Sequence, residues 1–184
     1  MADDHEQVSS LRAIAHPVRL RILSLLTGTA MSAAEIAREL GLTHANASYH
    51  LRVLADAGEV VEAGEEHIRG GVAKRYRHPW ERTPAGGRPS RRDHLAYVRA
   101  MADELVRRDA LRKPRSKTLM ADAELWVAPE VWSRALELLK EASALVHGQA
   151  RAPRAEGTIH VNLTAAAFQM SEPTAADDDQ ETGR

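Results

Sequence analysis

The sequence has no cysteine among its 184 residues, few aromatic residues and no long apolar run. The lack of cysteine excludes disulfide bonds, a thiol nucleophile and thiolate metal ligands. No stretch approaches the roughly 20 apolar residues that a membrane helix needs. Residues 1–10, MADDHEQVSS, are acidic where a secretion signal would be basic. We therefore expect a cytoplasmic protein without a membrane-spanning segment.

Aromatic residues make up only 4% of the chain and Phe occurs once, whereas the hydrophobic content of 43% is sufficient for a buried core. Alanine and leucine dominate this apolar set, which favours aliphatic, helix-rich packing. The expected fold class is mainly α with a small β component (α+β). The net charge of −1 excludes no class of partner, because local charge matters more than the sum for nucleic-acid binding.

The first 57 residues predict a series of helices separated by glycine. A short helix is expected over 8–15, and Pro17 suits the first turn of a second, apolar helix. Ser32 and Glu35 have the spacing of a capping box, and Gly41 ends that helix. A further helix over 43–57 follows at once. This layout is typical of a helix-turn-helix, in which the last helix enters the DNA major groove.

A basic hairpin is predicted after this helix. Two strands, 60–66 and 72–77, are expected around a turn at Gly70 and Gly71. Between residues 67 and 92 there are eight Arg and Lys against one acid, Glu81. A basic wing over 60–77 therefore completes an N-terminal winged helix-turn-helix domain, residues 1–80.

The rest of the chain divides into three parts. Residues 81–117 predict a linker and a long dimerisation helix, which Ser90 caps and which runs to about Arg112. Residues 118–170 predict a small β-α-β segment, with strands over 122–127 and 157–164 and a helix that begins at Pro129. A two-stranded sheet is marginal alone, so it should pack on the long helix or, as we favour, on a second copy. Residues 171–184 predict a disordered acidic tail.

The sequences HPVRLRILSLL, SAAEIARELGLTHANASYHLRVLADAGEVV and the glycine-centred hairpin resemble winged helix-turn-helix regulators of the arsenical-resistance repressor (ArsR) type. The resemblance covers the first 80 or so residues and implies a homodimer that binds an approximately two-fold symmetric operator and represses transcription. Metal-sensing members use cysteines, or Asp and His pairs on a C-terminal helix. Here cysteine is absent, and Asp93 and His94 are neighbours that point to different helix faces, so we assign no metal and no cofactor.

Two groups of residues are predicted to bind double-stranded DNA. Asn46 and Tyr49 are the leading candidates for base contacts, and phosphate contacts are expected from Ser48 and Arg52. His50 leans inward and is expected to hydrogen-bond within the domain. The alternative is an ordinary polar surface with a solvated wing. The complete set is Thr43, His44, Asn46, Ser48, Tyr49 and Arg52 in the helix, with Arg69, Lys74, Arg75 and Arg77 in the wing.

A small-molecule effector is a possible further partner. Trp126, Trp132, His160 and Asn162 could line its pocket, although such residues more often pack an interface. No phosphate loop or activated nucleophile is recognisable, so an enzyme is not expected. Two alternatives remain open: a winged-helix protein-interaction module, and a ligand-binding protein without sequence-specific DNA binding.

Overall fold

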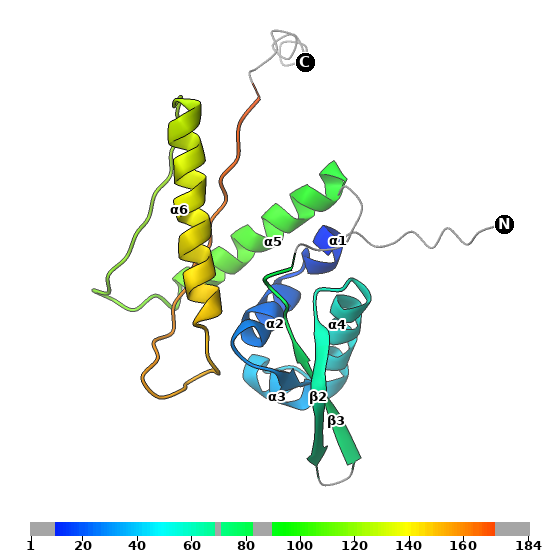
Figure 1. Ribbon diagram of the computed structural model, residues 1–184. Coiled ribbons are helices and arrows are strands. Elements are labelled where there is room, and N and C mark those ends of the chain that lie inside the picture. The colour runs from blue at the N-terminus through cyan, green and yellow to red at the C-terminus, as the bar shows by residue number, and fades with distance from the viewer. Residues whose placement is uncertain (1–9, 69–70, 83–89, 172–184) are drawn as a thin grey trace, which may run out of the picture.

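The computed structural model describes residues 10–68, 71–82 and 90–171. The predicted wing residue Arg69, most of the linker and the predicted acidic tail beyond residue 171 lie outside these ranges. The described chain is α+β, as predicted, with helices and one small antiparallel sheet (Figure 1). Residues 10–82, called the winged domain below, form its lower right part in Figure 1.

Four helices of the winged domain begin and end close to where the sequence predicts. They are α1 (Ser10–Ile14), α2 (Pro17–Gly28), α3 (Ala33–Leu40) and α4 (His44–Asp56). The capping box at the start of α3 is complete, because the Ser32 side chain accepts from the Glu35 amide while Glu35 accepts from the Ser32 amide at 2.7 Å. Gly41 ends α3 with φ 66°, a left-handed conformation that strains other residues. The turn between α3 and α4 is therefore set locally.

The sheet has three strands in the order β1-β3-β2, namely β1 (Met31–Ser32), β2 (Val61–Ile68) and β3 (Gly71–Arg77). The hairpin of β2 and β3 is the predicted wing. Its register shifts between Glu62 and Glu65, where Gly64 has φ 119°. Pairing of Met31 with Tyr76 joins the wing to the start of α3. The sequence did not predict β1.

One aliphatic core holds the winged domain together. The largest fully buried side chains are those of Ile22, Leu26, Ile36, Leu51 and Leu54. They come from α2, α3 and α4, so these three helices share one interior. Each such side chain contributes about 1.5–3 kcal/mol when it leaves water.

The long helix α5 (Arg91–Asp109) crosses the winged domain and packs on α1 and α2 (Figure 1). Ser90 caps it as predicted, since its hydroxyl accepts from the Asp93 amide at 3.1 Å. Ala100 and Glu104 are its buried residues. At about 100° per residue, they lie opposite an apolar stripe of the same helix, which remains largely exposed. The stripe consists of Leu95, Val98, Met101, Ala102, Leu105 and Val106.

The last part of the chain contains one helix, α6 (Pro129–Gly148), which begins at the predicted proline. The two strands expected around it, 122–127 and 157–164, are wrong for the single chain, because these residues form no strand. Trp126 is 87% exposed and Ile159 is 85% exposed. A strand needs a hydrogen-bonded neighbour, and the described chain places none beside either segment.

Candidate nucleic-acid interface

Helix α4 is fixed by one apolar face and by a cap at its first turn. Ala47, Leu51 and Leu54 are buried in the core. The Thr43 hydroxyl accepts from the Asn46 amide at 3.2 Å, so Thr43 is the N-cap that the sequence predicts. Because the buried residues lie on one side of the helix, the opposite face of α4 is presented to solvent.

The exposed face of α4 carries most of the residues predicted to contact DNA. Tyr49 is 56% exposed, His44, Asn46 and Arg52 are also exposed, and Ser48 is half-buried. By helical periodicity, Ser48, Tyr49 and Arg52 are adjacent near the centre of this face, while His44 and Asn46 lie toward its two edges. A row of compact donors and acceptors therefore faces outward. Of the two leading candidates for base contacts, Tyr49 is the more central and Asn46 lies toward one edge.

Behind this face lies a cluster of basic groups. His50 is buried as expected, but its Nδ1 has no hydrogen-bond partner among the described residues, and neither has Arg19 Nε. The His50 ring lies 4.9 Å from the His16 ring and 5.3 Å from the Tyr49 ring, centroid to centroid. Burial and then the neighbouring cations lower the pKa of His50, and burial and then Arg19 lower that of His16. Both imidazoles are therefore held neutral beneath Tyr49.

The wing brings acids as well as bases to this side of the molecule. Lys74 pairs with Glu62 at 2.7 Å, and this contact is the main cause that raises the Lys74 pKa. Arg75 contacts Glu66 and the Ala30 carbonyl, and it lies 3.2 Å from Glu35. Arg75 thus joins the wing to α3. The sequence analysis missed these acids because they come from β2 and α3 rather than from β3 itself.

Arg77 differs from these two wing bases. It is exposed at the end of β3, where it pairs in register with Val61. Within the described ranges, no ion pair involves Arg77. Of the three described wing bases, Arg77 is therefore the most available for a phosphate.

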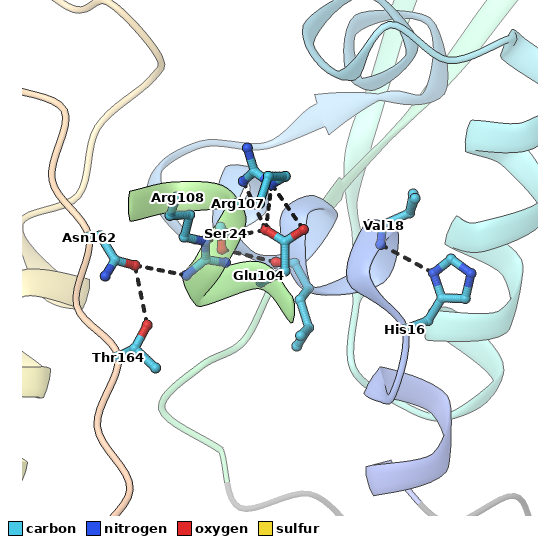
Figure 2. Close-up of polar contacts among 9 residues, drawn as sticks. His16, Val18, Ser24, Glu104, Arg107, Arg108, Asn162 and Thr164 are labelled. Atoms are coloured by element: carbon cyan, nitrogen blue, oxygen red, sulfur yellow. Dashed lines mark hydrogen bonds and ion pairs between the residues drawn. The ribbon is translucent and has the colours of Figure 1, made fainter. Parts of the chain in front are cut away.

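None of the four residues predicted to line an effector pocket is part of the cavity lining between α2, α5 and α6. Trp126 and His160 are exposed, and Trp132 is half-buried on α6. The Asn162 carbonyl oxygen accepts from Arg108 Nη1 at 3.0 Å and from the Thr164 hydroxyl at 3.2 Å (Figure 2). Arg108 in turn contacts Glu104, which also accepts from Arg107 (Figure 2). Asn162 therefore ties the C-terminal segment to α5.

Two further findings bear on the class of site. Across residues 10–68, 71–82 and 90–171, no three His, Asp or Glu side chains are grouped so that they could hold a metal ion. None of the helices in those ranges is both long and apolar enough to cross a bilayer.

Comparison with known proteins agrees with the geometry of the N-terminal part. Residues 14–61 match a family model described as a helix-turn-helix domain. This span runs from the end of α1 to the start of β2 and includes the whole of α4. A search of curated proteins returns no match. The match covers well under half of the chain, so it identifies residues 14–61 as a helix-turn-helix domain and supports a DNA-binding regulator in general.

Proposed function

We propose that the chain is a homodimeric, sequence-specific double-stranded DNA-binding transcription regulator of the arsenical-resistance repressor type. It represses by occupying a pseudo-palindromic operator, with α4 in the major groove and the wing along the backbone. The observation that carries this proposal is the outward polar face of α4 within a matched helix-turn-helix domain. Tyr49 and Asn46 read bases, while Arg52 and Arg77 hold phosphates.

A selection experiment tests the reading of bases. Purified protein is incubated with random duplexes, and the bound fragments are sequenced. We expect a motif whose half-sites lie about one helical turn apart. Tyr49→Ala and Asn46→Ala should flatten base preference, each lost contact reducing discrimination by about 1–3 kcal/mol. Arg134→Ala, an exposed change on α6, is the control and should leave the motif unaltered.

The wing needs a separate measurement because its bases differ in what they contact. Arg77→Ala should weaken binding equally for all sequences and lower the slope of log affinity against log salt by about one unit. Arg75→Ala should instead lower the melting temperature, since this side chain joins β2, β3 and α3. An unchanged salt slope in Arg77→Ala would remove the wing from the proposed interface.

The homodimer is proposed from the apolar surface that the single chain leaves uncovered. Leu95, Val98, Leu105 and Val106 are exposed on the side of α5 opposite the winged domain, and Val106 is 74% exposed. Leu125, Trp126, Ile159 and Phe168 add further exposed apolar area. A soluble monomer rarely keeps so much apolar surface, and a second copy would also supply the missing strand neighbours.

Light scattering during size-exclusion chromatography tests this assembly. The unaltered chain should elute with the mass of two copies. Leu105→Glu combined with Val106→Glu should give monomers with an unchanged circular dichroism spectrum. Arg38→Glu on α3 is the matched control and should stay dimeric. A monomeric unaltered chain at tens of micromolar would contradict the proposal.

A second candidate is a winged-helix module that binds protein rather than DNA. It is favoured by the charges of the two described wing strands, where Glu62, Glu65 and Glu66 match Lys74, Arg75 and Arg77 in number. Such a module would give no enriched motif in the selection and no sequence-dependent retention of DNA in a gel shift at moderate salt.

A further inference from the structure

A cavity of about 370 Å³ lies between the winged domain and the last part of the chain. Its apolar wall is built by Leu20 and Leu23 of α2, Met101 of α5, and Leu139 and Ala142 of α6. Residues Leu163–Ala165, which lie beside α6, also line it (Figure 1). The volume is within the range of roughly 300–1,000 Å³ that holds small organic ligands.

Three hydroxyl groups around this cavity present acceptors rather than donors. Ser24 Oγ donates to the Leu20 carbonyl at 2.9 Å, and Thr27 Oγ1 donates to the Leu23 carbonyl at 2.9 Å. Thr164 Oγ1 donates to Asn162 Oδ1 at 3.2 Å. A hydroxyl has a single proton, so each of these oxygens is left with lone pairs only.

Two histidines at the cavity also offer hydrogen-bond acceptors. His78 Nδ1 lies 2.7 Å from the Glu59 backbone oxygen, and His147 Nδ1 lies 2.7 Å from the Ser143 backbone oxygen. A carbonyl oxygen can only accept, so Nδ1 carries the proton in both rings. In the imidazole tautomer that carries its proton on Nδ1, Nε2 is the acceptor. The lining also contains the Glu59 side chain, whose residue is only 6% exposed.

The cavity also has donors, namely the Ser143 and Tyr97 hydroxyls and Arg108, of which the arginine is already paired. Arg108 donates to Glu104 and to Asn162, and the Glu104 residue, itself part of the lining, is 2% exposed (Figure 2). Burial and then the Glu59 carboxylate raise the pKa of Tyr97, which therefore keeps its phenolic proton. Arg107 and Arg108 both pair with Glu104, so Glu59 is the carboxylate of the lining that no arginine contacts among the described residues.

From these contacts we propose that the cavity is a binding site for an organic ammonium ion with an apolar body. The three N–H bonds of the ammonium group are donated to lone pairs among Thr27, Thr164 and the two histidines, and Glu59 balances its charge. The apolar body lies against the α2 and α6 leucines. Burying an ammonium ion requires such a set of acceptors, because each N–H that leaves water without a partner weakens binding. The ligand would bridge the winged domain and α6.

Calorimetric titration of the full chain tests this site with two probes of similar shape and opposite charge. Naphthylmethylammonium should bind saturably, and naphthoate should bind at least about tenfold more weakly because it offers no donor. Leu139→Trp fills the cavity and should abolish ammonium binding. Leu138→Trp, an adjacent residue of α6 that is outside the lining, should not. The melting curves of both variants should match that of the unaltered chain.

A second pair of variants tests the acceptors without filling the cavity. Thr27→Val removes one hydrogen-bond acceptor with little change of shape and should lower the affinity for the ammonium probe several-fold. Thr118→Val, a change at an exposed residue, should have no effect. Equal affinity for the two probes would overturn the proposal, as would equal binding to the Leu139→Trp and Leu138→Trp proteins. The titrations contain no DNA, so a negative result here is independent of the proposed operator binding.

Discussion

The winged domain and the chain beyond α5 use similar amounts of leucine, valine and alanine in opposite ways. In the winged domain, side chains from three helices bury one another, as Ile22, Ile36 and Leu51 do. In the part beyond α5, residues 111–171, α6 contributes no buried residue and most large apolar side chains are exposed. The comparison indicates that the first region can be stable by itself, while the second needs a further molecule to cover it.

The largest expected effect separates these regions directly. Leu51→Ala should lower the free energy of unfolding by about 2–5 kcal/mol, because it leaves a cavity in the core. In dilute solution, Leu125→Ala should change it by no more than about 0.5 kcal/mol. Urea unfolding at several protein concentrations measures both. If a second copy covers Leu125, the loss of unfolding free energy caused by Leu125→Ala should rise with protein concentration. The loss caused by Leu51→Ala should not. A large loss of unfolding free energy for Leu125→Ala in the monomer would contradict the proposed difference between the two regions.

The same difference explains what the sequence could predict. The capping box at Ser32 and Glu35, the turn at Gly41 and the cap at Thr43 depend on residues within four positions of one another, so they could be read directly. The strands over 122–127 and 157–164 could not be read this way, since a strand exists only beside its neighbour. The alternation of Ile159, Val161 and Leu163 with polar residues is typical of a strand, but it does not say which chain pairs with that strand.

Long-range contacts also limited the prediction of the site. The bases of β3 were identified, but Arg75 is held by Glu35 and Glu66, which are far from it in sequence. The cavity was missed because its lining comes from α2, α5, α6 and residues 163–165. One signal was available. Glu104 precedes Arg107 and Arg108 by three and four positions, which is the spacing of ion pairs along one helix face. Such pairing allows the acid to be buried.

The next largest effect is expected from acidic pH, which should destabilise the winged domain. His16 and His50 have lowered pKa values in the folded protein, so the unfolded chain takes up protons first as the pH falls below 6.5. The free energy of unfolding should be highest above that pH and should decline from there until the folded histidines also protonate. His50→Gln should reduce this decline, as melts between pH 7.5 and 5 would reveal. An identical decline in the variant would assign the effect to other groups.

A smaller effect should distinguish the caps of α3 and α5. Ser32 is buried and takes part in a reciprocal capping box, whereas Ser90 is exposed beside Asp93. We expect Ser32→Ala to lower the free energy of unfolding by about 1–2 kcal/mol and Ser90→Ala by about 0.5 kcal/mol. Urea unfolding measures both changes. Equal losses would mean that α5 is as firmly integrated as the helices of the winged domain.

The smallest expected effect concerns the ion pair between Lys74 and Glu62 on the wing. Both side chains are about half exposed, so water screens their attraction. A double-mutant cycle with Lys74→Ala and Glu62→Ala should give a coupling in the free energy of unfolding no larger than the error of the measurement. So weak a pair would let Lys74 exchange Glu62 for a DNA phosphate at little cost. A coupling of several times that size would instead make Lys74, like Arg75, a structural residue of the wing and leave Arg77 as its main phosphate contact.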